Sequence, residues 1–243
     1  MRNIFLLPML VVCFAFKAQD SVSPLFKTDA PVYAVARLKT PMPIDGNWNK
    51  KQWRKVKAAT IDNFIREIPA FRPKTEIKMM YDDDNIYVIF RVHDQYVRCI
   101  TKDGNGHVWE DAAVELFFCP DTTQADKYFN LEINCGGTAL LGYRSKKPAD
   151  EDVSTIEIAH SMPQIVDPEI KEPVIWFLEY RIPLSTLDKY SNITRPKKDV
   201  RWKANFCKIA ENNSNPHHMT WSPITAPKPN FHMPSFFGSV VFK

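Results

Sequence analysis

The side chains best suited to chemistry in this sequence are carboxylates gathered near one tryptophan. Glu110, Asp111 and Glu115 follow closely after Trp109, and Glu132 lies in the next strand-like segment. Two carboxylates that face one cleft can hydrolyse a glycoside, one as the acid and the other as nucleophile or base. Nothing in the sequence raises the pKa of either group, so we expect these residues to contact a ligand rather than to cleave one.

Signatures of other catalytic sites are missing from the sequence. It contains no GxSxG motif, no HExxH motif and no glycine-rich phosphate loop. His217 and His218 are neighbours, which on a strand would point to opposite faces and chelate one metal poorly; we expect both in a solvated loop. The sequence therefore predicts a protein that is not an enzyme.

The acidic segment Asp82-Asp83-Asp84-Asn85 allows two interpretations. Its residue types favour a hairpin turn. Their oxygens would also suit calcium, although the order of an EF-hand loop is absent. We expect the turn and keep a structural calcium site at Asp82 and Asp84 as the alternative.

Trp109 is the most suggestive aromatic residue. Sugars present C–H faces that stack on aromatic rings, and their hydroxyl groups need planar polar partners. The segment Val108-Trp109-Glu110-Asp111 combines both features. A core position is the alternative, because most tryptophans are largely buried; we expect Trp176, within an apolar run, to be one of these.

Apolar residues at a period of two predict the strands that must position this segment. They alternate over 77–81 and 86–92, on either side of the acidic turn, which is typical of a half-buried antiparallel hairpin. Similar runs occupy 114–118, 129–133, 174–182, 202–209 and 239–242. Short strands with polar and proline-rich connections indicate an all-β, antiparallel sandwich or barrel, with one helical turn near Trp53.

Composition and charge limit the classes of partner that the protein can bind. The net charge of +4 over 243 residues is not clustered into a basic stripe, so we expect no nucleic-acid partner. One domain over residues 41–243, preceded by an N-terminal lead at 19–40, is the simplest organisation. Cys99, Cys119, Cys135 and Cys207 are widely spaced without a CxxC pair, which favours buried thiols and leaves disulfides open.

Residues 1–18 have the pattern of a signal peptide. Arg2 precedes an apolar run that extends to Phe16, and Ala18 is a plausible cleavage point. We expect a secreted or periplasmic protein. The alternative is a surface lipoprotein anchored through Cys13. No later segment is long and apolar enough to span a membrane.

Five segments, in order along the chain, resemble the family-9 carbohydrate-binding modules, within the wider group of DOMON-like β-sandwiches. The segments are Ile44-Asp45-Gly46 with Trp53, Tyr81 to Val88, His93-Asp94, Trp109 to Phe117, and Phe231 to Gly238. The resemblance implies a jelly-roll-like sandwich that binds a polysaccharide or oligosaccharide, in the best-known members at the reducing end. Glycoside hydrolases that act on the same glycan are the implied partners.

The resemblance also implies where the sugar lies. Trp109 and Phe231 fall on two tryptophans that hold the sugar in the family. Glu115 falls on a sugar-contacting glutamate and Asn134 on an asparagine, whereas Glu132 stands where those members have an arginine. Bound calcium occurs in the family as a structural element, which adds Asp94 to the candidate ligands.

Two alternatives come from other classes of protein. DOMON-like sandwiches include haem-binding electron carriers, in which methionine or histidine ligates iron. Met79, Met80, His232 and Met233 are the candidate ligands here. The other alternative is an interaction subunit that keeps the sandwich and has lost the sugar site.

Overall fold

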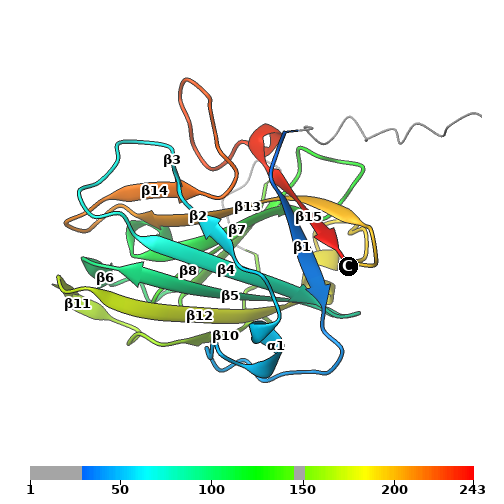
Figure 1. The fold of residues 1–243 in the computed structure, drawn as a ribbon, viewed down its shortest axis with the longest axis horizontal. Helices are drawn as coiled ribbons and strands as arrows, with labels where there is room; N and C mark the ends of the chain where they lie inside the picture. Colours follow the sequence, from blue (N-terminus) through cyan, green and yellow to red (C-terminus); the bar gives the residue numbers. More distant parts are fainter. Residues whose placement is uncertain (1–28, 145–150) are drawn as a thin grey trace, which may run out of the picture.

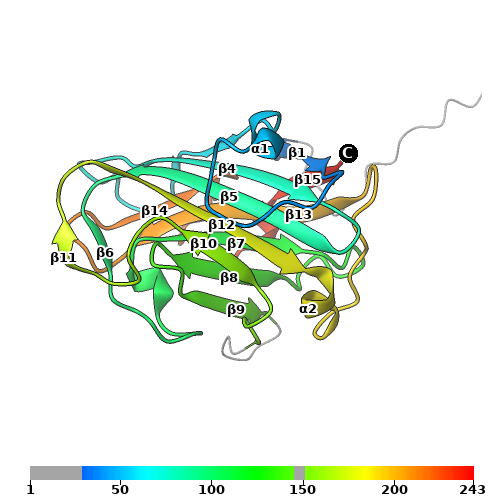
Figure 2. The same cartoon turned by 90° about the horizontal axis from the view of Figure 1, so that it is seen from below.

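The computed structural model of the protein describes residues 29–144 and 151–243, whose strands form two packed layers (Figures 1 and 2). In the first layer, which we call the β5 layer, the order is β10-β12-β5-β4, with β2 beside β4. These strands are β2 (Ala59–Ile61), β4 (Lys74–Tyr81), β5 (Asn85–Asp94), β10 (Glu157–His160) and β12 (Val174–Pro183). The predicted hairpin is confirmed, because Tyr81 pairs with Ile86 across the acidic turn.

The second layer, which we call the β7 layer, has the order β15-β13-β7-β8-β9, with β14 also on β13 and β3 on β14. Its strands are β3 (Asn63–Phe64), β7 (Ala113–Cys119), β8 (Phe129–Asn134), β9 (Ala139–Tyr143), β13 (Arg201–Ala210), β14 (His217–Thr220) and β15 (Gly238–Phe242). The remaining elements are β6 (Val97–Cys99), β11 (Val166–Ile170), α1 (Lys51–Arg54), α2 (Leu184–Asp188) and two 3₁₀ turns, η1 (Val108–Glu110) and η2 (Pro234–Phe236).

Strand β1 (Val32–Arg37) joins the two layers. Its first four residues pair with β15 and its last two pair with β4, both in parallel. The other strand pairs of the described residues are antiparallel. The expectation of a lead over residues 19–40, outside the domain, is therefore wrong for residues 32–37. These residues alternate exposed and buried side chains, with Val35 completely buried.

The all-β sandwich predicted from the sequence is confirmed, and its core lies between the layers. Alternate residues of facing strands fill this core, among them Val88 and Phe90 of β5, Leu116 and Phe118 of β7, and Trp176 of β12. Because neighbouring strand residues point to opposite faces, the intervening residues of β7 face outward from the sandwich.

The β4–β5 hairpin is covered on both faces, not half-buried as expected. The segment that contains α1 lies on the side of β4 away from the β7 layer (Figure 2). There Trp48 and Trp53 pack against Met80 and Tyr87. The alternation of apolar residues predicted the two strands correctly, but it does not show what covers the outer face of the hairpin.

Glu179 of β12 fixes this covering segment. Its buried carboxylate accepts hydrogen bonds from the backbone N–H groups of Asp45 and Gly46 at 2.9 and 2.8 Å and from Trp53 Nε1 at 2.8 Å. Lys50 Nζ completes the arrangement with an ion pair of 2.7 Å. The Ile44-Asp45-Gly46…Trp53 segment therefore has a structural role, on the opposite side of the molecule from the β7 layer.

Cys99, Cys119, Cys135 and Cys207 are buried and free, as the preferred interpretation had it. Within the described ranges no helix is long and apolar enough to cross a bilayer. The predicted signal peptide and Cys13 lie outside the described residues.

Candidate functional site

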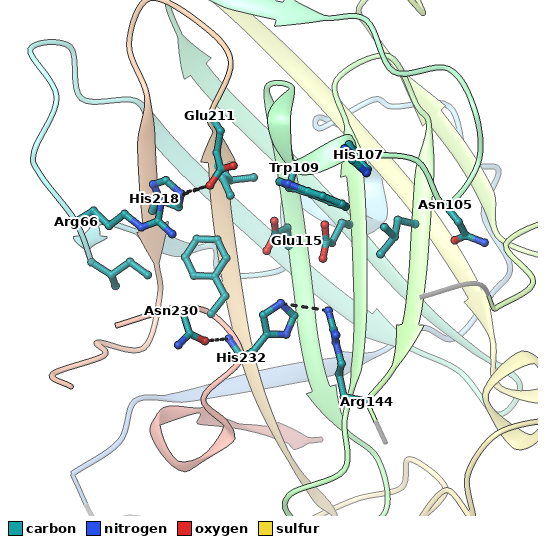
Figure 3. Close-up of a pocket in the computed structure, with 15 residues that line it drawn as sticks. Arg66, Asn105, His107, Trp109, Glu115, Arg144, Glu211, His218, Asn230 and His232 are labelled. Atoms are coloured by element: carbon teal, nitrogen blue, oxygen red, sulfur yellow. Dashed lines mark hydrogen bonds and ion pairs between the residues drawn. The ribbon is translucent and has the colours of Figure 1, made fainter. Parts of the chain in front are cut away.

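A pocket of about 450 Å³ opens on the outer face of the β7 layer (Figure 3). Its volume falls within the usual range for small-ligand sites, about 300–1,000 Å³. Its floor comes from β7 and β8, and its walls come from the loop that carries η1 and from the segment between β14 and β15. Its polar and aromatic lining residues are Arg66, Asn105, His107, Trp109, Glu115, Glu132, Arg144, Glu211, His218, Asn230, Phe231 and His232.

Glu115 and Glu132 lie side by side on the floor. They are directly paired residues of β7 and β8, so their side chains share one face with Cβ atoms about 5 Å apart. Glu115 is 2 % exposed and Glu132 is 5 % exposed. Asn130 Nδ2 donates to Glu132 Oε1 at 2.7 Å. Within the described chain, Oε2 of each glutamate has no hydrogen-bond partner.

Burial and neighbouring carboxylates raise the pKa values of this pair. Burial, and then the charge of Glu132, raise the pKa of Glu115 well above its ordinary value. Burial raises the pKa of Glu132 to about 7, against the opposing effects of Asn130 and Arg144. The expectation that nothing perturbs these carboxylates is therefore wrong. The sequence also suggested a solvated outer face for Glu115, and the walls of the pocket bury it instead.

Trp109 forms one wall of the pocket and is only partly buried. It lies on η1, where the ring of His107 stacks on it at a centroid distance of 4.5 Å and an interplanar angle of 28°. His107 Nδ1 in turn lies 3.1 Å from Glu110 Oε1. Trp109 and Glu115 line the same pocket (Figure 3).

Asn134 does not line the pocket. Its side chain is completely buried, where Nδ2 donates to Thr101 O and to Asp111 Oδ2, both at 2.9 Å. The same Asp111 carboxylate accepts the backbone N–H groups of Ile100 and Thr101. The sequence-based prediction that Asn134 contacts the sugar is therefore wrong. Asn134 and Asp111 instead hold the loop that precedes Trp109.

Phe231 lines the pocket but is a packed wall, only 7 % exposed. Its ring meets Phe117 edge-on at 6.1 Å and tilts against His218 at 5.9 Å. The next residue, His232, is more open, and Figure 3 shows it across Glu115 from Trp109. His232 Nδ1 lies 3.0 Å from Tyr128 Oη, and Arg144 Nη2 lies 3.4 Å from His232 Nε2.

Several lining residues were missed by sequence reasoning. His218 is on β14, not in a solvated loop, and its Nε2 lies 2.8 Å from Glu211 Oε1. Burial lowers the pKa of His218. Arg66 pairs with the same Glu211 oxygen at 3.4 Å. Only the assembled sheet brings these residues beside Glu115, and no local sequence signal marks them.

The candidate calcium ligands have other partners. Asp94 is buried, and its Oδ2 lies 3.3 Å from both Trp176 Nε1 and Lys208 Nζ. Asp82 accepts the Tyr87 hydroxyl at 2.6 Å and the backbone N–H groups of Asp84 and Asn85. No three His, Cys, Asp or Glu side chains come together as a metal site among the described residues.

The carboxylates of Asp82 and Asp94 do not fit a calcium ion, because hydrogen-bond donors or a lysine ammonium already occupy their oxygens. The calcium site predicted at Asp82, Asp84 and Asp94 stays a prediction that this arrangement does not favour. The candidate haem ligands do not come together at one site. Met79 packs between the layers, Met80 packs on the opposite face of β4, and His232 lines the pocket.

The molecule is therefore a β-sandwich with a polar and aromatic ligand pocket on the outer face of one layer. Residues 49–242 match the model of carbohydrate-binding family 9, and the chain belongs to this family. Family 9 consists of binding modules, not catalytic domains. No curated protein is significantly similar in sequence.

Solved structures share the fold. A candidate carbohydrate-binding protein from Bacteroides uniformis superposes with a TM-score of 0.78 and 24 % identity, covering 88 % of this chain and 100 % of that one. A family-9 module from Caldicellulosiruptor kristjanssonii was solved with cellotriose and with glucose. Both structures give a TM-score of 0.63 at 16 % identity and cover 88 % of this chain, and 94 % and 96 % of the module.

Proposed function

We propose that the protein binds a sugar or the end of a glycan in the pocket on the β7 layer, without catalysing a reaction on it. The observation that carries the proposal is the partly exposed Trp109 ring beside two carboxylates with free oxygens. An aromatic face and adjacent hydrogen-bond acceptors are the two features that a sugar ring requires. Membership of carbohydrate-binding family 9 supports the same function.

Glu115 and Glu132 supply acceptors for sugar hydroxyl groups, while Asn105, Asn230 and Arg144 supply donors around the rim. Trp109 supplies the stacking surface, and His232 faces it across the carboxylates (Figure 3). The bound ring would therefore lie over Glu115.

A glycan array followed by isothermal titration calorimetry tests this proposal. Wild-type protein should bind at least one class of glycan, and Trp109→Ala should weaken that binding by about two- to tenfold, since a stacked aromatic contact is worth about 0.5–1.5 kcal/mol. The control is Phe177→Ala, which removes a partly buried aromatic ring from the β5 layer. Equal affinities of wild type and Trp109→Ala would place the sugar site elsewhere.

We also propose that the chain is exported and acts beside glycoside hydrolases that degrade the same glycan. The charged and apolar pattern of residues 1–18 supports export. The intact mass of protein from the native host should correspond to a chain that begins near Gln19. A lipid-modified Cys13 would favour the lipoprotein alternative, and a cytoplasmic chain that retains Met1 would exclude both.

A further inference from the structure

The floor of the pocket concentrates negative charge without a paired cation. Glu115 and Glu132 are each at least nine-tenths buried, face each other across β7 and β8, and keep one oxygen without a partner. Among the described residues, no lysine or arginine forms an ion pair with either carboxylate. Unpaired buried charge is costly, and such groups normally meet a counter-charge or share a proton.

The surrounding charged groups are held by other partners. On β13, the Lys208 ammonium lies on the inner side of the sheet with Asp94 and His217, at 3.3 and 2.8 Å. Arg144, after β9, contacts His232 at 3.4 Å; its charge lowers the pKa of Glu132, but it forms no ion pair with either glutamate. The other charged or titratable residues of the lining form two groups, Glu211 with Arg66 and His218, and His107 with Glu110.

A hydroxyl group and an amino group of a ligand would differ in how well they meet the charge and the free acceptor oxygens of Glu115 and Glu132. A neutral sugar hydroxyl donates one hydrogen bond and leaves the charge in place. A protonated amine donates up to three hydrogen bonds and also supplies the missing positive charge. Charge-assisted hydrogen bonds are about twice as strong as neutral ones, and burial strengthens them further.

We propose that Glu115 and Glu132 form a subsite for a protonated amine, so that the preferred ligand of the pocket is a sugar with a free amino group. This inference rests on the proposed sugar-binding function, and it names the class of sugar. Trp109 then stacks on the sugar ring while the ammonium group lies between the two carboxylates.

Binding of the amine is coupled to proton release. The empty pair retains a proton near neutral pH, because burial raises the pKa of both glutamates and the charge of Glu132 raises that of Glu115 further. An incoming ammonium group takes the place of that proton. Affinity for the amino sugar should therefore increase as pH rises from 5 to 7, and protons should appear in the buffer on binding.

The experiment is calorimetric titration of the purified protein at pH 7 with glucosamine, N-acetylglucosamine and glucose. Acetylation removes the charge and leaves the sugar ring unchanged. Glucosamine should bind at least about tenfold more tightly than the two neutral sugars, the equivalent of one charge-assisted hydrogen bond. Titration in buffers of different ionisation enthalpy should show proton release for glucosamine alone.

Glu132→Gln tests the carboxylate directly, because glutamine keeps the shape and an acceptor oxygen for Asn130. This variant, and Glu115→Gln as a second one, should bind glucosamine no more tightly than glucose or N-acetylglucosamine, whereas wild-type protein prefers glucosamine. Glu157→Gln, an exposed carboxylate on β10, should keep the preference.

The outcomes separate the two proposals. If glucosamine and glucose bind wild-type protein with equal affinity, the amine subsite is wrong and the sugar-binding function stands. If neither these sugars nor any arrayed glycan binds, the proposed function is wrong, and the amine subsite fails with it.

Discussion

Glu115 and Glu132 are paired residues of neighbouring strands, and their carboxylates meet on the floor of a pocket where neither has a basic partner within the described chain. Such a pair does not contribute to stability once it is charged. Its position at the base of a ligand pocket is therefore better explained by what it binds. The structure also gives the pair a pH signature that can be measured without any ligand.

Glu132→Gln should become more stable relative to wild type as pH rises. The pKa of Glu132 is raised to about 7 in the folded chain. The protonated side chain therefore adds to the free energy of unfolding of the wild type. This contribution is fully present below the unfolded pKa near 4.5 and is lost as pH rises through 7. Glutamine stays neutral throughout. Urea unfolding at pH 5 and pH 8 should show a relative gain of roughly 2–3 kcal/mol for the variant.

The matched comparison removes the titrations of groups that do not interact with Glu132. The pKa of His217 is lowered to about 3 by burial and then by Lys208, which affects wild type and Glu132→Gln alike and cancels in their difference. A relative stability that does not change with pH would mean that Glu132 is ionised normally in the folded chain.

Trp109→Ala should reduce sugar binding with a loss of stability of only about 1 kcal/mol, because the ring is partly exposed. Trp53→Ala should cost about 3–5 kcal/mol, because that ring is completely buried and donates to Glu179. Chemical denaturation of both variants measures the contrast. A cost for Trp109→Ala as large as that of Trp53→Ala would make Trp109 a structural residue.

Glu179→Gln should destabilise the fold by about 3–5 kcal/mol, because it removes the buried charge that accepts from Asp45 and Gly46 and leaves Lys50 with only the half-exposed Asp45 carboxylate. Sugar affinity should not change, since Glu179 lies in the other layer from the pocket. Glu76→Gln, which breaks a more exposed pair with Arg91, should cost about 1 kcal/mol or less. Similar costs for the two variants would show that the Glu179 network is not a main support of the covering segment.

Lys208→Met should destabilise the protein by about 3–5 kcal/mol, because it leaves Asp94 buried without a positive partner. Adding Asp94→Asn to this variant should recover part of the loss. Since Lys208 supplies the charge that a cation would bring to Asp94, calcium and a chelator should give wild-type protein the same melting temperature. A calcium-dependent rise would show that a cation site exists after all.

Several features followed from the sequence because they depend on local pattern. The acidic turn between two alternating segments predicted the β4–β5 hairpin. Alternation around Val114 and Leu116 placed Glu115 on the outer face of β7, and the ordered motifs indicated the family and Trp109. The hairpin and the outward direction of Glu115 held because strand geometry fixes which side chains share a face, whatever the rest of the chain does.

The pattern did not predict what covers each face. Residues 32–37 carry a strand signal too weak to read in isolation, and their place between the layers depends on β4 and β15. The outer face of β4–β5 is buried by the segment around Trp53, and the face that carries Glu115 is enclosed by the segment that holds Phe231. Burial, and with it the raised pKa of Glu115, depends on these distant segments.

The sequence by itself determined an all-β chain of family 9 with Trp109 and Glu115 on one face. The tertiary structure alone decided that Glu132 faces Glu115, that Asn134 supports a loop, and that Arg144 and His218 reach the pocket. The physical reason is that pairing register and loop packing depend on contacts between residues far apart in the chain. The charge of a site is therefore known only when the strands that share it are assembled.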